Sequence, residues 1–247
     1  MSRFTVVFDA NVLYPAPSRD LLMQLATTGL FRAHWTDDIH DEWIRNLKAN
    51  RPDLSDAALA RTRELMDRVV DDARVTGYES LIEGLDLPDP DDRHVLAAAL
   101  RAGADAIVTF NLKDFPEAAL APYDVEAIHP DAFVSYQCDL AQATVCEAVR
   151  LIRGRLHDPP YDIDAYLTHL AASGYPATAE TLRGWRNFLL RQAYPPCLRS
   201  TYEWASIDPI RTFGNVPGRF APVCPGTPGT LPSDAGTPGP GDMAYAD

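Results

Sequence analysis

Blocks of apolar residues alternate with amphipathic segments along the first half of the chain. Residues 4–8, Phe-Thr-Val-Val-Phe, form a short apolar run that favours a buried central strand, and residues 106–108, Ala-Ile-Val, favour a second one. Between these runs, apolar positions recur at helical spacing. Strands that alternate with helices are typical of right-handed β-α-β crossovers, so we predict an α/β fold with a parallel sheet flanked by helices.

Polar N-cap residues and terminating glycines delimit the helices expected between the two strands. Ser, Thr and Asp side chains can accept hydrogen bonds from the free amides of a first helical turn, and glycine readily ends a helix. The predicted helices run from Ser18 to Gly29, from Thr36 to about Ala49, from Ser55 to about Asp72 and from Asp92 to Gly103.

The pattern changes near Asp139. Residues 140–195 show helical spacing only, with helices predicted around Val149, Leu167 and Trp185. Beyond Ile207, proline, glycine and small polar residues dominate, a composition from which no core can be built. We therefore predict an α/β domain over residues 1–138, a small α-helical subdomain over residues 139–205, and a Pro/Gly-rich disordered tail over residues 206–247.

Composition and charge narrow the functional classes. Hydrophobic residues make up 46% and charged residues 23% of the chain, which is globular composition. No apolar stretch approaches the roughly 20 residues that span a bilayer, so we expect no membrane association. The cysteines show no C-x-x-C spacing, which favours a reduced, cytoplasmic protein. The net charge of −13 opposes phosphate binding unless divalent cations invert the local field, and residues 1–139 hold 13 Lys and Arg against 25 Asp and Glu.

Four carboxylates stand where a parallel sheet would bring them together. Asp9 follows the first strand, Asp114 lies past the turn after the second, Asp92 opens the helix that leads into that strand, and Glu42 lies on the second helix. Ligands of such folds bind outside the carboxyl ends of the strands. Clustered carboxylates repel unless a cation holds them, and an all-oxygen set suits Mg²⁺ or Mn²⁺, which serve phosphodiester hydrolysis.

Each of these acids also has a purely structural interpretation. Asp9 and Asp114 are placed as turn or capping residues would be, and Asp92 could interact with the N-terminus of its helix while Asp91 is the N-cap. Glu42 could belong to a solvated helix face. Residue types and spacing alone leave both interpretations open.

Four segments, taken in order, resemble the acid-bearing elements of PIN-domain ribonucleases, and more narrowly of the VapC-type toxins of bacterial toxin–antitoxin pairs. The segments are residues 6–13 (VVFDANVL), 38–43 (DIHDEW), 92–99 (DRHVLAAA) and 107–115 (IVTFNLKDF). The resemblance covers roughly residues 4–135 and includes all four acids. It implies a PIN-like fold and an endoribonuclease in which water attacks RNA phosphodiester bonds with Mg²⁺ or Mn²⁺.

The resemblance also implies a role for each acid. Asp9 and Asp92 are expected to bind the metal directly, Asp114 directly or through water, and Glu42 to orient or deprotonate the attacking water.

Three short polar residues beside the acids are candidates to hold the carboxylates in place. Asn11, Thr109 and Asn111 could do so by hydrogen bonds, although a plain turn after each strand would explain them equally well. Arg93 and Lys113 could contact substrate phosphate, but exposed charges at such places are usually only solvated.

The helical part suggests partners. Residues 140–195 look similar, more loosely, to a helical extension of some longer PIN toxins. Its basic and aromatic side chains could bind or stack on an RNA strand; they are Arg183, Trp185, Arg186 and Arg191. Alternatively, Trp185 could belong to the core. The expected partners are an RNA substrate and a small antitoxin that inserts a basic side chain among the acids. A homodimer formed through the extension is a further option.

Two other functions remain open at this point. One is a housekeeping PIN nuclease for RNA processing, and the other is a non-catalytic module whose acids hold a structural cation or a basic peptide. A hydrolase with an aspartyl nucleophile would need a second acid two residues after Asp9, and that position is Asn11.

Overall fold

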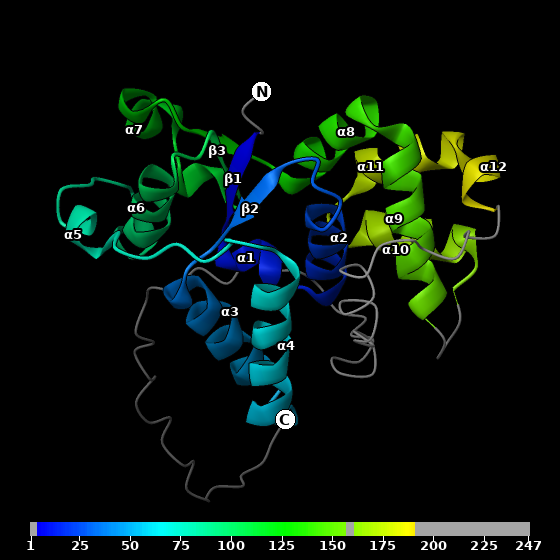
Figure 1. Cartoon of the computed structure of the whole chain (residues 1–247), viewed down its shortest axis with the longest axis horizontal. Coiled ribbons are helices and arrows are strands. Elements are labelled where there is room, and N and C mark those ends of the chain that lie inside the picture. The colour runs from blue at the N-terminus through cyan, green and yellow to red at the C-terminus, as the bar shows by residue number, and fades with distance from the viewer. Residues whose placement is uncertain (1–3, 157–160, 191–247) are drawn as a thin grey trace, which may run out of the picture. The chain divides into compact units, whose positions relative to one another are not determined.

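Four short parallel strands form the sheet of the computed structural model, which describes residues 4–156 and 161–190 (Figure 1). Their order across the sheet is β2-β1-β3-β4. The strands are β1 (Thr5–Phe8), β2 (Arg32–His34), β3 (Ala106–Val108) and β4 (Glu126–Ile128). The central strands β1 and β3 are buried throughout, as expected for apolar runs covered by helices on both faces. The predicted α/β fold with a parallel sheet is confirmed.

The helices between β1 and β3 follow the predicted order, with a few additions. They are α1 (Ala10–Leu13), α2 (Ala16–Ala26), α3 (Asp37–Asn50), α4 (Asp56–Val69), α5 (Glu79–Ile82), the 3-10 turn η1 (Pro90–Asp92) and α6 (Arg93–Ala102). Two predicted N-caps are confirmed, because the side chain of Thr36 accepts from the amide of Ile39 at 3.1 Å and that of Ser55 from the amide of Ala58 at 3.2 Å. Gly103, with φ of 59°, ends α6 as predicted.

The predicted N-cap at Ser18 is wrong. Helix α2 begins at Ala16, after the extended residue Pro15 and with a second proline, Pro17, in its first turn. A proline there has a preset φ and loses no helical hydrogen bond, so the helix starts earlier than a polar cap would suggest. Ser18 is instead fully buried within the helix, and its hydroxyl donates to the carbonyl of Val12 at 2.7 Å.

Strands β2 and β4 escape prediction because neither contains an apolar run. β2 reads Arg-Ala-His and β4 reads Glu-Ala-Ile, three residues each at the two edges of the sheet. Their register comes from pairing with the centre of the sheet, where Val6 lies between Ala33 and Ala106. Such short edge strands are set by tertiary contacts rather than by local sequence.

From residue 140 on, the described chain is helical, as predicted, whereas the segment between β3 and that point was not predicted. After β3 come η2 (Leu112–Asp114), α7 (Glu117–Leu120) and η3 (Ala121–Tyr123), and after β4 come α8 (Pro130–Leu140), α9 (Gln142–Arg155), α10 (Ile163–Ala172), α11 (Pro176–Gly184) and α12 (Arg186–Leu189). The helix expected around Trp185 is in fact two, because α11 ends at Gly184 and α12 starts at Arg186. The predicted domain boundary at 138/139 falls inside α8. Arg191 and the predicted tail 206–247 lie outside the described residues.

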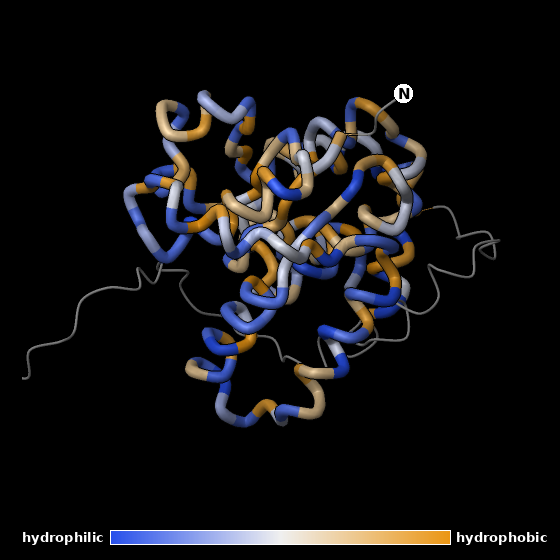
Figure 2. The backbone as a smooth tube through the Cα atoms, turned by 60° about the vertical axis from the view of Figure 1, so that its left-hand side comes forward, coloured by the Kyte–Doolittle hydropathy of each residue, from blue (hydrophilic) through white to orange (hydrophobic). Residues whose placement is uncertain are grey.

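The helices after β4, here called the helical extension (residues 130–156 and 161–190), share a core with the α/β part. All described residues belong to one compact unit. Arg155 of α9 donates to Asp20 and Gln24 of α2, both at 2.6 Å, and all three side chains are buried. Hydrophobic positions gather toward the middle of this body, whereas the helices at its margins alternate in hydropathy (Figure 2). No helix within the described residues is long and apolar enough to cross a membrane.

Candidate active site

Asp9 lies at the point where the carboxyl ends of β1 and β3 meet. Its backbone amide donates to the carbonyl of Val108 at 3.1 Å, which places it directly beside Thr109. It occupies the N-cap position of α1, but its side chain makes no capping hydrogen bond, and the residue is only 3% exposed. A buried carboxylate that caps nothing must be stabilised by other groups.

Two polar side chains hold the Asp9 carboxylate. The hydroxyl of Thr109 donates to Asp9 Oδ2 at 2.7 Å, and the amide of Asn11 donates to the same oxygen. Asn11 Nδ2 also lies 2.8 Å from Thr109 Oγ1, and the backbone amide of Asn111 donates to that hydroxyl at 2.9 Å. Because Thr109 Oγ1 accepts from two groups, its own proton points to Asp9. Asp9, Asn11 and Thr109 therefore form one hydrogen-bonded unit.

Asp114 is held from the same loop. It closes the 3-10 turn η2, and the side-chain amide of Asn111 donates to its Oδ2. The side chains expected to hold the acids therefore do contact them: Asn11 and Thr109 contact Asp9, and Asn111 contacts Asp114.

The carboxylate of Asp92 is not used for capping. Asp92 occupies the N-cap position of α6 without a side-chain cap hydrogen bond, and Asp91 does not take that position. The capping of the preceding turn is done by Asp89, whose Oδ1 accepts from the amide of Asp91 at 2.9 Å. Asp92 is half-buried, and its carboxylate is available to bind a cation.

Glu42 has a partner that the sequence reasoning missed. His94, in the first turn of α6, places Nε2 3.4 Å from Glu42 Oε2. The side chain of His94 is 15% exposed, and its Nδ1 is buried without a hydrogen-bond partner. Although burial opposes it, the hydrogen bond and charge of Glu42 raise the pKa of His94. The sequence does contain a signal for this contact, because His94 follows Asp92 by two residues and so lies in the first turn of the same helix.

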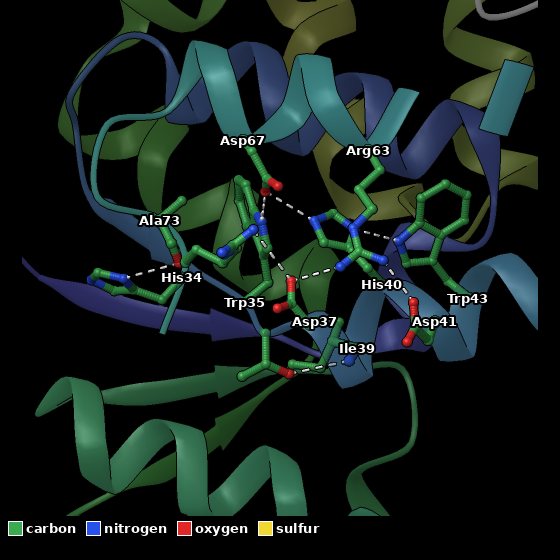
Figure 3. A network of polar contacts seen from close by, with 12 residues as sticks. His34, Trp35, Asp37, Ile39, His40, Asp41, Trp43, Arg63, Asp67 and Ala73 are labelled. Atoms are coloured by element: carbon green, nitrogen blue, oxygen red, sulfur yellow. Dashed lines mark hydrogen bonds and ion pairs between the residues drawn. The ribbon is translucent and has the colours of Figure 1, made fainter. Parts of the chain in front are cut away.

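The helix that carries Glu42 is fixed by a partly buried polar network (Figure 3). Asp67 of α4 accepts at Oδ1 from Trp35 Nε1 at 2.7 Å and pairs with His40 Nε2 at 3.0 Å. Trp43 Nε1 donates to His40 Nδ1 at 3.0 Å, so the proton of the neutral imidazole lies on Nε2 and points to Asp67. Helix α3 is thereby attached to α4 and to the end of β2.

A second link between the same two helices is made by charge. Arg63 of α4 reaches Asp37 at 2.6 Å and Asp41 at 2.7 Å, both on α3 (Figure 3). Glu42 follows directly after Asp41. Because these contacts fix the first turns of α3, they also fix the position of Glu42.

Burial and neighbouring acids raise the pKa values of Asp9 and Asp92. Burial raises the pKa of Asp9 to about 6, against the hydrogen bond from Thr109 and together with the charge of Glu42. Burial raises the pKa of Asp92 to about 7, and the nearby charges of Asp9, Asp89, Asp114 and Glu42 add to this effect. Asp92 therefore interacts electrostatically with Asp9, Asp114 and Glu42, and Asp9 also interacts with Glu42.

The donors fit a hard divalent cation, although the acids are not drawn together as ligands. Within residues 4–156 and 161–190, no group of three or more His, Cys, Asp or Glu side chains converges closely enough to hold a metal ion. An all-oxygen donor set suits Mg²⁺ or Mn²⁺.

The basic groups suggested for RNA binding are mostly engaged with acids. Arg183 pairs with Glu180 at 2.7 Å, Arg186 pairs with Asp164, and Trp185 is partly buried against the core. Arg93 stands 4.0 Å from the exposed Asp86. The structure thus favours a core role for Trp185.

Two family models match the chain. One described as "PIN domain" matches residues 5–113, and one described as "VapC50 C-terminal domain" matches residues 130–184. A curated relative, "Putative ribonuclease VapC50" of Mycobacterium tuberculosis, is 44% identical over 85 residues, which are 34% of this chain and 50% of that protein. The match therefore spans about half the length of the relative. No solved structure shows a significant match.

Proposed function

This chain belongs to the PIN-domain family and carries a VapC50 C-terminal domain, and from that premise we propose that it is a metal-dependent endoribonuclease and the toxin of a toxin–antitoxin pair. One observation carries the catalytic part of the proposal. Asp9 is a buried carboxylate whose side chain makes no capping hydrogen bond, is held by Thr109 and Asn11, and interacts electrostatically with two further acids, Asp92 and Glu42.

Asp9, Asp92 and Asp114 would hold the ion. When bound, Mg²⁺ or Mn²⁺ would lower the pKa of an attacking water and stabilise the charge on the phosphodiester. Glu42 would orient or deprotonate that water, and His94, 3.4 Å away, would keep the Glu42 carboxylate in place. Thr109, Asn11 and Asn111 would keep the ligands preorganised.

The same acids explain how a protein partner could silence the enzyme. The region of residues 1–139 is strongly acidic, with 13 Lys and Arg against 25 Asp and Glu. A small antitoxin with a basic side chain would find four mutually repelling carboxylates and relieve their repulsion by entering among them. RNA, by contrast, would need the metal to offset this charge.

The nuclease proposal is tested by cleavage of total RNA with purified protein and Mn²⁺. We expect cleavage by the wild type, loss of cleavage on addition of a chelator, and a loss of at least roughly a hundredfold in Asp9→Asn, because the variant keeps its shape but loses a ligand charge. Asp139→Asn is the matched control, since Asp139 is exposed and the net charge changes equally. Equal cleavage by the wild type and by Asp9→Asn would contradict the proposal.

The toxin part has a separate test. Induced expression in a bacterial host is expected to arrest growth for the wild type and not for Asp9→Asn. Co-expression of an open reading frame adjacent to the gene is expected to relieve the arrest. If the purified protein cleaves RNA but its expression leaves growth unchanged, a housekeeping nuclease is the better assignment.

A further inference from the structure

The ring of Phe110 connects the candidate site to the helical extension. Phe110 directly follows Thr109, and its ring meets that of His129 edge-on at 5.3 Å and that of Tyr175 at 6.0 Å between centroids. The closest approach is made by Gly174, where an added Cβ would lie 2.7 Å from Cε1 of Phe110. Only a glycine leaves room for the ring at this place.

The backbone on either side of this ring belongs to the site. The amide of Phe110 donates to Asn11 Oδ1 at 3.0 Å, and the amide of Asn111 donates to Thr109 Oγ1 at 2.9 Å. Asn11 and Thr109 are the two side chains that hold Asp9. A displacement of Phe110 would therefore disturb both hydrogen bonds and, through Asn111, the support of Asp114 as well.

The turn that receives the ring is itself firmly held. The hydroxyl of Tyr175 lies 2.6 Å from Ser18 Oγ, and both residues are fully buried. The next helix, α11, is anchored by Asp131 of α8, whose carboxylate accepts from the amides of Ala177 at 2.9 Å and Thr178 at 2.8 Å. Gly174 has a φ of 98°, a conformation that favours glycine.

We propose that the Gly174–Tyr175 turn of the extension is a positioning element for the nuclease site, acting through the ring of Phe110. The turn fixes the loop of residues 109–114, and with it the hydrogen bonds that orient Asp9 and Asp114. Phe110, Gly174 and Tyr175 are positioning residues that do not touch the reacting atoms. The predicted effect on catalysis rests on the proposed function, whereas the predicted ordering of the loop of residues 109–114 does not.

Amide exchange in the metal-free protein measures the loop directly. NMR exchange rates of the amides at residues 110 and 111 are expected to rise at least roughly tenfold in Phe110→Ala and in Gly174→Ala, since both changes release the loop from the turn. Val149→Ala is the control, because Val149 is a buried residue of α9 in the same extension. It should lower stability without altering these two exchange rates.

Kinetics on an RNA oligonucleotide that spans a cleavage site mapped with the wild type give the second readout. We expect kcat to fall roughly 10- to 100-fold in Phe110→Ala and in Gly174→Ala with KM changed far less, because small misplacement of reacting groups mainly slows the chemical step. Gly174→Ala should cause little further loss when combined with Phe110→Ala, since both act through the same ring.

The outcomes separate the two proposals. Unchanged amide exchange and unchanged kcat in Phe110→Ala, or fully additive losses in the double variant, would overturn the positioning role. A wild type that cleaves no RNA would overturn the proposed function, and the exchange rates would still decide whether the extension orders the loop. If Gly174→Ala does not fold, Phe110→Ala and its two readouts decide alone.

Discussion

At the scale of single residues, the candidate site carries more negative charge than its surroundings can neutralise. Asp9 is buried with a pKa raised to about 6, and burial and neighbouring acids raise that of Asp92 to about 7. The groups that donate to Asp9 are the neutral side chains of Thr109 and Asn11, and the imidazole of His94 lies beside Glu42. Residues selected for folding alone would not be arranged in this way, so the site is expected to cost stability when no cation is present.

This cost predicts a pH-dependent stability of the metal-free protein. A carboxyl group whose pKa is raised on folding contributes stability that is fully present below its unfolded pKa of 3.8 and is lost as the pH rises through about 7. Asp92→Asn stays neutral throughout. We expect the variant to exceed the wild type in free energy of unfolding by about 1–2 kcal/mol at pH 8, after discounting for the partial exposure of Asp92, and to match it at pH 4.

Urea denaturation in the presence of a chelator at the two pH values measures this difference. Asp139→Asn changes the net charge equally at an exposed position and should show no pH-dependent gain. A gain for Asp92→Asn that is as large at pH 4 as at pH 8 would show that its origin is not the charge of this carboxylate.

The role of a site residue could be predicted from the sequence where its partners lie within the same short motifs. Asn11 and Thr109 were candidates to hold Asp9 because they lie close to it or directly after the second strand, and both side chains donate to its carboxylate. His94 and Phe110 could not be found in this way. Their roles depend on contacts with Glu42 and with Gly174, which only the folded chain brings near.

At the scale of elements, α3 and α4 form an antiparallel pair that is fastened by polar groups. Asp67 accepts from Trp35 and His40 at its Oδ1, while Arg63 joins Asp37 and Asp41 (Figure 3). Burial opposes ionisation of Asp67, but the hydrogen bonds from His40 and Trp35 outweigh it and lower its pKa. The position of Glu42 on α3 depends on this fastening.

Removal of the shared acceptor should loosen the pair. Asp67→Ala leaves the ring nitrogens of Trp35 and of the buried His40 without their partner, and we expect it to lower the free energy of unfolding by about 2–3 kcal/mol at pH 7. The loss should begin to shrink once the pH falls below the unfolded pKa of 3.8, because the stability that a lowered pKa contributes is fully present above that value and is lost as the pH falls through the folded pKa. Chemical denaturation at pH 7 and pH 3.5 measures both, and Asp71→Ala, an exposed acid just after α4, is the control. Equal losses in the two variants would show that the acceptor is dispensable.

Elements could be predicted where their signals are local. The caps at Thr36 and Ser55 and the glycine that ends α6 involve residues three or four apart, and these predictions are confirmed. The early start of α2, set by prolines, and the break at Trp185 were missed, because competing local signals decide them. Strands β2 and β4 carry no local signal at all and exist through pairing with the centre of the sheet.

At the scale of the whole described molecule, the α/β part and the helical extension fold around one core. The buried ion pair of Arg155 with Asp20 lies between them, with side chains 8% and 6% exposed. Tyr175 on Ser18 and Gly174 on Phe110 add further contacts across the same junction. Separate unfolding of the two parts would expose all of these groups, so we expect a single cooperative transition.

Disruption of the ion pair between Arg155 and Asp20 tests whether the two parts unfold together. Arg155→Met leaves the Asp20 carboxylate buried beside an apolar side chain, and we expect it to lower the free energy of unfolding by about 3 kcal/mol while the transition stays single. Adding Asp20→Asn should recover part of this loss, since the buried charge is then gone. Denaturation followed by circular dichroism and by tryptophan fluorescence checks both points, and two separate transitions in the wild type would contradict the shared core.

The position of Gly174 in the sequence has a consequence for the timing of synthesis. A ribosome makes the four acids and Phe110 first, and the turn that packs on the Phe110 ring emerges only after α8, α9 and α10. On our inference the nascent α/β part leaves the exit tunnel with a loose loop. The proposed nuclease site would thus be complete only after the chain has been synthesised beyond this turn, which delays activity beside the RNA of the ribosome itself.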